Sequence, residues 1–164
     1  MKLFNHLSLI VLLVSLFSSA TSFAENERTI AIDTQQTSTH VTKINGKKLK
    51  YSATTGTQPV WDKEGNPTAS LFYTYYQRTD IKDNSKRPLL ISFNGGPGSA
   101  SVWMHVAYTG PRVLNVDDEG YPLQPYGVKT NPYSILDVAD IVFVNPVNTG
   151  YSRVLPNKEG NMPT

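Results

Sequence analysis

A nearly continuous apolar run, residues 89–93, leads directly into the segment Asn94-Gly95-Gly96-Pro97-Gly98. Such a run is typical of a strand that is covered on both faces in a parallel sheet. The two adjacent glycines let the backbone adopt angles closed to other residues and approach a ligand closely. Backbone N–H groups at a strand end, just before a helix, form a concave cluster of donors for negative charge. The sequence therefore predicts a strand, a ligand-binding loop and a helix in succession, with an ordinary strand-to-helix turn as the alternative.

Two kinds of ligand suit a cluster of backbone donors. In acyl-transfer enzymes such donors stabilise the tetrahedral oxyanion, and removing one costs about 2.7–4 kcal/mol of transition-state stabilisation. A phosphate is the other candidate. However, no Gly-Lys-Ser or Gly-Lys-Thr follows the glycines, and the Gly-x-Gly-x-x-Gly spacing is not met. We therefore interpret the segment as an oxyanion loop rather than a nucleotide site.

The hairpin signals come before this loop. Asn45-Gly46 lies between two strand-like runs, 41–44 and 47–51, and both positions of such a turn need a positive φ. A further strand is expected at 69–77, where Leu, Phe, Thr and Tyr are dense. These patterns predict antiparallel strands in the first half of the chain.

The second half of the sequence predicts an alternation of strands and a helix. A short helix is expected after the loop, with Ser99 as its N-cap and Gly110-Pro111 at its end. Residues 117–127 are expected to be irregular, and 141–144 form a second strand of the buried type. Antiparallel hairpins followed by strand, helix and strand predict an α/β fold, the incomplete opening part of a larger sheet.

Residues 1–24 have the pattern of a secretory signal peptide. A positive start precedes an apolar core, and small residues precede a cleavage site after Ala24. A membrane anchor is the rival interpretation, but this apolar core is short for roughly 30 Å of hydrocarbon. Residues 25–40 are polar and aperiodic, so they are expected to form a mobile leader before a domain at 41–164.

The amino-acid composition limits the classes of binding partner and the cellular compartment that suit this chain. The net charge of +2 is too small to indicate a nucleic-acid partner or an anionic membrane. The chain has no cysteine, which excludes a disulfide scaffold, a cysteine nucleophile and a cysteine-based zinc site. Export without cysteine suits a bacterial periplasm or exterior. The acidic run at 117–119 lacks the spacing of a calcium loop, and no metal or other cofactor is expected.

Several motifs occur together in a fixed order. They are Ser92-Phe93-Asn94-Gly95-Gly96-Pro97-Gly98-Ser99, Gly110-Pro111, Asn131-Pro132-Tyr133-Ser134 and Pro146-Val147-Asn148-Thr149-Gly150-Tyr151-Ser152-Arg153. Over residues 41–153 the sequence resembles the serine carboxypeptidase family of the α/β-hydrolases. Its opening, residues 44–57, looks like that of the family's bacterial branch.

The resemblance implies roles for four residues. The backbone N–H of Gly96 would form half of the oxyanion hole, with Gly95 shaping the loop. The side-chain amide of Asn94 would donate to the free C-terminal carboxylate of a peptide substrate, which an amide can do in any protonation state of the site. Tyr108 stands where the eukaryotic pattern has a carboxylate-binding Glu, and Ser92 stands where it has Trp. A phenol can donate at neutral pH, so the resemblance implies weaker acid preference.

The catalytic triad of such an enzyme is not found in the chain. A serine hydrolase needs its nucleophile in a Gly-x-Ser-x-Gly elbow, followed by an acid and a histidine base. His105 is expected to be packed or hydrogen-bonded on the helix, and His40 falls in the polar leader. Asp137 and Asp140 are expected to be solvated or capping residues. The chain is therefore predicted to be inactive alone.

Other functions remain open from the sequence. The chain is consistent with a non-catalytic remnant or a binding module that retains the loop. It is also consistent with an acyltransferase or a proline-iminopeptidase-like aminopeptidase, although the latter usually has His where Asn94 stands. The resemblance implies strand order 1-2-4-3-5, so strand 89–93 is expected to lack its outer neighbour and to leave an apolar edge that makes the chain poorly soluble or molten.

Overall fold

The structure is a computed structural model that describes residues 32–157 and 160–162. The expected signal peptide and the start of the expected leader lie outside the described residues. The elements are β1 (Thr34–Ile44), β2 (Lys47–Trp61), β3 (Pro67–Arg78), η1 (Asn84–Lys86), β4 (Leu89–Ser92), α2 (Val102–Met104), η2 (His105–Thr109), β5 (Arg112–Leu114), β6 (Val128–Thr130), η3 (Ile135–Asp137), β7 (Asp140–Val144) and β8 (Arg153–Val154).

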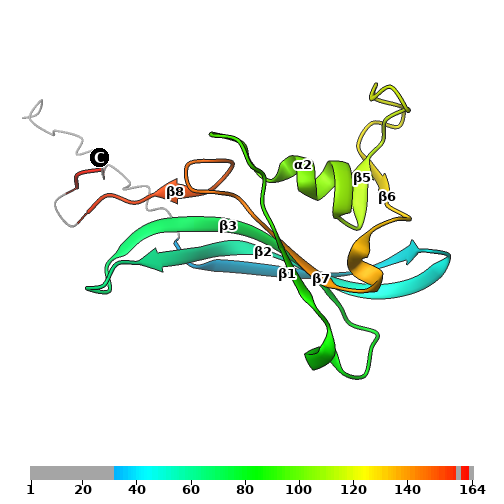
Figure 1. Ribbon diagram of the computed structural model, residues 1–164, viewed down its shortest axis with the longest axis horizontal. Coiled ribbons are helices and arrows are strands. Elements are labelled where there is room, and N and C mark those ends of the chain that lie inside the picture. The colour runs from blue at the N-terminus through cyan, green and yellow to red at the C-terminus, as the bar shows by residue number, and fades with distance from the viewer. Residues whose placement is uncertain (1–31, 158–159, 163–164) are drawn as a thin grey trace, which may run out of the picture. The chain divides into compact units, whose positions relative to one another are not determined.

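One mixed sheet is the largest element of the described chain (Figure 1). Its strands follow the order β1-β2-β3-β7-β4, and β8 pairs with β3. Every pairing is antiparallel except that of β4 with β7, which is parallel. Strand β7 therefore lies between β3 and β4 although it follows both in sequence. The fold is the predicted α/β sheet, in which antiparallel hairpins precede a parallel pair.

The first hairpin confirms the turn expected at Asn45-Gly46. These residues have φ of 48° and 76°, and Ile44 pairs with Lys47 across the turn. Both strands are longer than expected, because β1 and β2 stay paired out to Thr34 and Thr57. The tight turn thus sets the register of a long two-stranded ribbon.

The prediction that residues 25–40 form a mobile leader is wrong from Thr34 onward, because that part of the segment belongs to β1. Its side chains are exposed, so it lacks the hydrophobic alternation that signals a strand. Cross-strand threonine pairs replace apolar contacts: the hydroxyls of Thr37 and Thr54 lie 2.9 Å apart. Threonine favours strands and forms such hydroxyl pairs.

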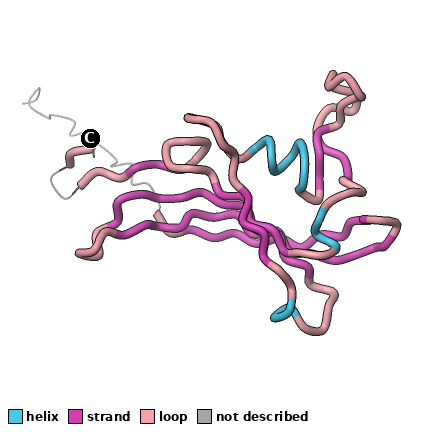
Figure 2. The backbone as a smooth tube through the Cα atoms, in the orientation of Figure 1, coloured by secondary structure: helices cyan, strands magenta, loops and turns pink. Residues whose placement is uncertain are grey.

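The core lies where the sheet meets the helical turns. Its buried members are Ile44, Leu49, Tyr51, Leu136, Ile141 and Phe143. Met104 of α2 packs against this cluster, and α2 with η2 lies on one side of the strands (Figure 2). These packed residues hold the helix, and with it the end of the glycine loop, against β7.

Strand β4 is the last strand of the sheet among the described residues. Its run was expected to be covered on both faces, but Leu89 is 56% exposed, Ile91 60% and the following Phe93 65%. No described segment covers them or pairs with the outer edge of β4. The expected apolar edge is therefore present, and the poor solubility it implies stays a prediction.

A buried ion pair fixes the start of β4 on β7. The Nε of Arg87 lies 2.9 Å from Oδ1 of Asp140, and both side chains are almost entirely buried. Arg87 also donates to the carbonyl of Leu136 at 2.8 Å, and the backbone N–H of Arg78 donates to Asp140. Asp140 is thus not the solvated residue expected from the sequence, because two arginine-bearing segments surround it.

Substitution of Arg87 by Met should lower the free energy of unfolding by about 3–5 kcal/mol, because it leaves the Asp140 carboxylate buried without its partner. Urea denaturation at low protein concentration measures this change. The matched control is Lys86→Met, since Lys86 and Asp83 form an exposed pair at 3.9 Å that solvent screens, so its loss should have little effect. Equal effects of the two substitutions would contradict the structural role of Arg87.

Candidate active site

The glycine loop leaves the end of β4 with one open side. Gly96 and Gly98 have φ of 85° and 80°, angles that favour glycine. A Cβ added to Gly95, Gly96 or Gly98 would meet no atom within 4 Å. Glycine is thus required at 96 and 98 by the backbone conformation, and the side-chain position of each of the three glycines is open.

The backbone donors of this loop are largely unused. Within the described residues, the N–H groups of Gly95 and Gly96 donate to no acceptor, whereas the N–H of Ser99 donates to the carbonyl of Gly96 at 3.3 Å. Two successive free donors beside an open space are a suitable arrangement for an anionic atom.

Asn94 ties the loop together through its side chain. Its Nδ2 donates to the Gly95 carbonyl at 3.1 Å and to the Ser99 hydroxyl at 2.9 Å. Ser99 was expected to cap the helix, and this is wrong: α2 begins at Val102 with Ser101 in the N-cap position. The hydroxyl of Ser99 is drawn instead to the Asn94 amide, so the loop closes on itself.

Ser101 and Asn145 join the loop to the end of β7. The buried Ser101 hydroxyl accepts from the Asn94 N–H at 3.1 Å and donates to the Val144 carbonyl. The Ser101 N–H donates to the Asn145 side-chain oxygen at 3.0 Å. Neither residue was predicted from the sequence to belong to the site. A polar residue directly after a buried strand, as Asn145 is, was the available signal.

The motifs that contain Gly150 and Asn131 have structural roles. A Cβ on Gly150 would lie 2.2 Å from Nδ2 of Asn145, so the segment after β7 passes closely beside that residue. The Asn131 side chain donates to the carbonyls of Tyr108 and Gly110 at 2.9 and 2.8 Å. Because Asn131 is buried, these bonds hold the C-terminal end of η2 in place.

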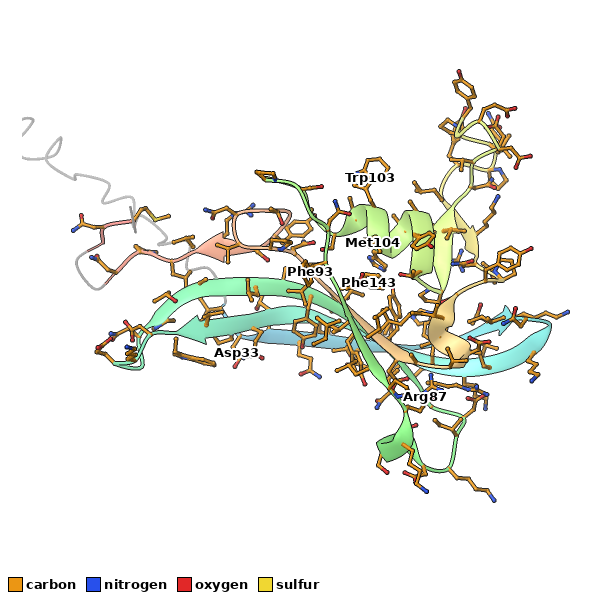
Figure 3. All side chains as sticks on the ribbon, viewed as in Figure 1. Asp33, Arg87, Phe93, Trp103, Met104 and Phe143 are labelled. Carbon is orange, nitrogen blue, oxygen red and sulfur yellow. The ribbon has the colours of Figure 1, made fainter. Side chains whose placement is uncertain are left out.

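Tyr108 lines a cavity of about 670 Å³ between the helical turns and the β5–β6 hairpin. Trp103, Lys129 and Tyr133 also line this cavity, whereas Asn94 and the glycines of the 94–98 loop do not. Tyr108 is 69% exposed. In Figure 3, Trp103 projects from the side of α2 that faces away from the sheet, and Phe143 lies on the sheet side. The structure therefore does not bring Tyr108 and Asn94 together around one cavity.

His105 is packed and hydrogen-bonded, as the sequence predicted. Its Nε2 lies 2.5 Å from the hydroxyl of Tyr76, and its ring stacks on Phe143 at 4.6 Å. Burial lowers the pKa of His105 to about 4 and raises the pKa of Tyr76. The imidazole is therefore neutral at physiological pH and links the helix to β3. His40 differs from expectation, since it lies in β1 and stacks on Tyr51.

The described residues do not offer a metal centre. No group of three or more His, Asp or Glu side chains among residues 32–157 and 160–162 is placed to hold an ion. Over the same part of the chain, no helix is long and apolar enough to cross a membrane. The acidic residues at 117–119 lie in a surface turn, where the Tyr121 N–H donates to Asp117.

The chain is thus an α/β protein in which free backbone N–H donors lie at the end of a parallel strand. A family model for serine carboxypeptidases matches residues 46–162. The chain belongs to the serine carboxypeptidase family, which is a family of peptidases.

Three proteins illustrate the relationship. Serine carboxypeptidase-like 36 of Arabidopsis thaliana is 38% identical over 88 residues, which are 53% of this chain and 17% of that protein. Carboxypeptidase Y homolog A of Pyrenophora tritici-repentis is 28% identical over 129 residues, 78% of this chain and 22% of that protein. The crystal structure of KEX1(delta)p, a prohormone-processing carboxypeptidase from Saccharomyces cerevisiae, is 26% identical, covers 70% of this chain and 23% of that chain, and has a TM-score of 0.49. The chain thus spans less than a quarter of each.

The buried His105 should make the fold sensitive to acid. An unfolded histidine takes up a proton near its ordinary pKa of 6.5, whereas folded His105 does so only near 4. The unfolded state therefore binds more protons between these values, and the free energy of unfolding should fall by up to about 3 kcal/mol as the pH drops from 6.5 to 4.

Urea denaturation at several pH values across this window measures the slope. His105→Phe should reduce the slope, whereas His40→Gln, which replaces an exposed histidine of β1, should leave it unchanged. A slope that His105→Phe does not alter would contradict this role of the buried imidazole.

Proposed function

We propose that this chain supplies the oxyanion loop of a secreted serine-type carboxypeptidase. The observation that carries the proposal is the pair of unpartnered N–H groups at Gly95 and Gly96, beside an open space at the end of β4. The N–H of Gly96 donates to the oxyanion that forms when a serine attacks the scissile carbonyl. A second donor comes from the residue after the nucleophile, in a segment that this chain does not contain.

Asn94 selects the chain end of the substrate in this proposal. Its Nδ2 exchanges the Gly95 carbonyl, 3.1 Å away, for the C-terminal carboxylate, while its bond to Ser99 keeps the side chain oriented. A charged acceptor makes a stronger hydrogen bond than a neutral carbonyl, so the exchange is favourable. The family resemblance also assigns Tyr108 to this carboxylate. Because Tyr108 and Asn94 do not line one cavity in this chain, this role requires the complete polypeptide to bring the two side chains together.

The signal peptide at 1–24 directs the protein to a bacterial periplasm or exterior, with cleavage after Ala24. No nucleic-acid or membrane partner is part of the proposal, and the substrate is a peptide with a free C-terminus. The described residues hold no Gly-x-Ser-x-Gly elbow, so catalysis needs a polypeptide in which the elbow, acid and base accompany this chain.

Such a polypeptide should hydrolyse a blocked dipeptide that has a free C-terminal carboxylate and not the matching C-terminal amide. Asn94→Leu should lower kcat/KM for the free acid by about 1.5–3 kcal/mol in free-energy terms, the value of a hydrogen bond to a charged group. The matched control is Asn84→Leu, the same change at an exposed position of η1 outside the loop, which should leave kcat/KM unchanged. Equal rates on acid and amide would contradict carboxypeptidase action and favour another hydrolase or a binding role.

The same enzyme should lack a steep acid preference. A phenol donates at neutral pH, whereas a glutamic acid donates only when protonated, so kcat/KM should not fall sharply above roughly pH 6. Tyr108→Glu should introduce that fall, and Tyr121→Phe, on the exposed hairpin turn, should leave the profile unchanged. A sharp fall above pH 6 in the unaltered enzyme would refute the role given to Tyr108.

A further inference from the structure

The chain contains the dipeptide Asn-Gly twice, at Asn45-Gly46 and at Asn94-Gly95. Glycine after asparagine leaves the next backbone nitrogen unhindered, because glycine has no Cβ. We propose that Asn94 is a site of spontaneous deamidation, with the nitrogen of Gly95 as nucleophile, and that the fold protects Asn45 from the same reaction.

The reaction balances without any oxidant or reductant. Hydroxide removes the proton of the Gly95 N–H, and the nitrogen forms a bond to Cγ of Asn94. The bond between Cγ and Nδ2 breaks, and Nδ2 leaves as ammonia with a proton from water. Water then opens the five-membered imide at either carbonyl, which gives aspartate or isoaspartate. The net change is the addition of one water and the loss of one ammonia.

The surroundings of Asn94 favour this attack. Its Nδ2 lies 3.1 Å from the carbonyl oxygen of Gly95, so the Asn94 side chain lies close to the backbone of the residue whose nitrogen is the nucleophile. The Gly95 N–H donates to no acceptor in the described chain, and the side of Gly95 where a Cβ would stand is open, so the ring has room to form. Gly46 shares both features, so the contrast between the two dipeptides rests on the contacts of Asn45.

The surroundings of Asn45 disfavour attack of the Gly46 nitrogen on its side chain. Its Nδ2 donates to Oδ2 of Asp137 at 2.7 Å, and its N–H donates to the Pro132 carbonyl at 3.0 Å. The Asp137 carboxylate disfavours a second negative charge nearby, both on the deprotonated nitrogen of Gly46 and on an aspartate at 45. The turn is also held between the paired residues Ile44 and Lys47.

Deamidation would change the chemistry of the loop. An aspartate at 94 offers acceptors where the amide offered donors, and isoaspartate lengthens the backbone by one atom. If the proposed function holds, either product places a negative charge beside the site of the oxyanion and the substrate carboxylate. The modification itself does not depend on that function.

Timed incubation of the full chain at mildly alkaline pH, followed by peptide mapping with mass spectrometry, tests the proposal. In native buffer Asn94 should convert several-fold faster than Asn45, and in urea the two dipeptides should convert at similar rates. Equal native rates, or faster conversion of Asn45, would overturn it. The readout is mass alone, so failure here leaves the peptidase proposal untouched.

Two variants identify the groups involved. Gly95→Ala, at a position with space for a Cβ and no positive φ, should slow conversion of Asn94 several-fold and leave Asn45 unchanged. Asp137→Asn removes the carboxylate beside Asn45 and should speed conversion of Asn45 while leaving Asn94 unchanged. Undiminished conversion of Asn94 in Gly95→Ala would exclude attack by the Gly95 nitrogen.

Discussion

The parallel pairing of β4 with β7 is fixed at both ends, and the position of the glycine loop depends on it. At the start of β4, Arg87 and Asp140 form a buried ion pair. At the end, Ser101 bonds to the Val144 carbonyl and to the Asn145 side chain. A short strand has few ladder hydrogen bonds of its own. These side-chain contacts therefore set where β4 stops and where the loop begins.

The loop itself is built from backbone rather than from charged side chains. Its donors are N–H groups, and no ionisable side chain contacts Asn94 or the glycines through a hydrogen bond or ion pair in the described residues. Fixed dipoles of this kind need no protonation change and little reorganisation when negative charge develops beside them. The same openness leaves the Gly95 nitrogen accessible, so the property suited to binding an anion also exposes Asn94 to chemical attack.

The sequence predicted those features that depend on neighbouring residues. The Asn45-Gly46 turn, the order of antiparallel and parallel strands and the packed state of His105 follow from local turn chemistry and apolar patterning. The extension of β1 to Thr34 could not be predicted, because its support comes from Thr57, 23 residues away. Likewise, Asp140 is buried only because Arg87, 53 residues away, neutralises it. Ser99 and Ser101 look equally suited to cap a helix, and only tertiary contacts with Asn94 and Val144 distinguish them.

The insertion of β7 between β3 and β4 has a consequence for the nascent chain. The ribbon β1–β2–β3 joins strands that are adjacent in sequence, so it can assemble as soon as these residues leave the ribosome. Strand β4 has no partner at that moment, because Arg87 must await Asp140, 53 residues later. During synthesis this apolar strand therefore stays without its partner strand until residues 140–144 have been made.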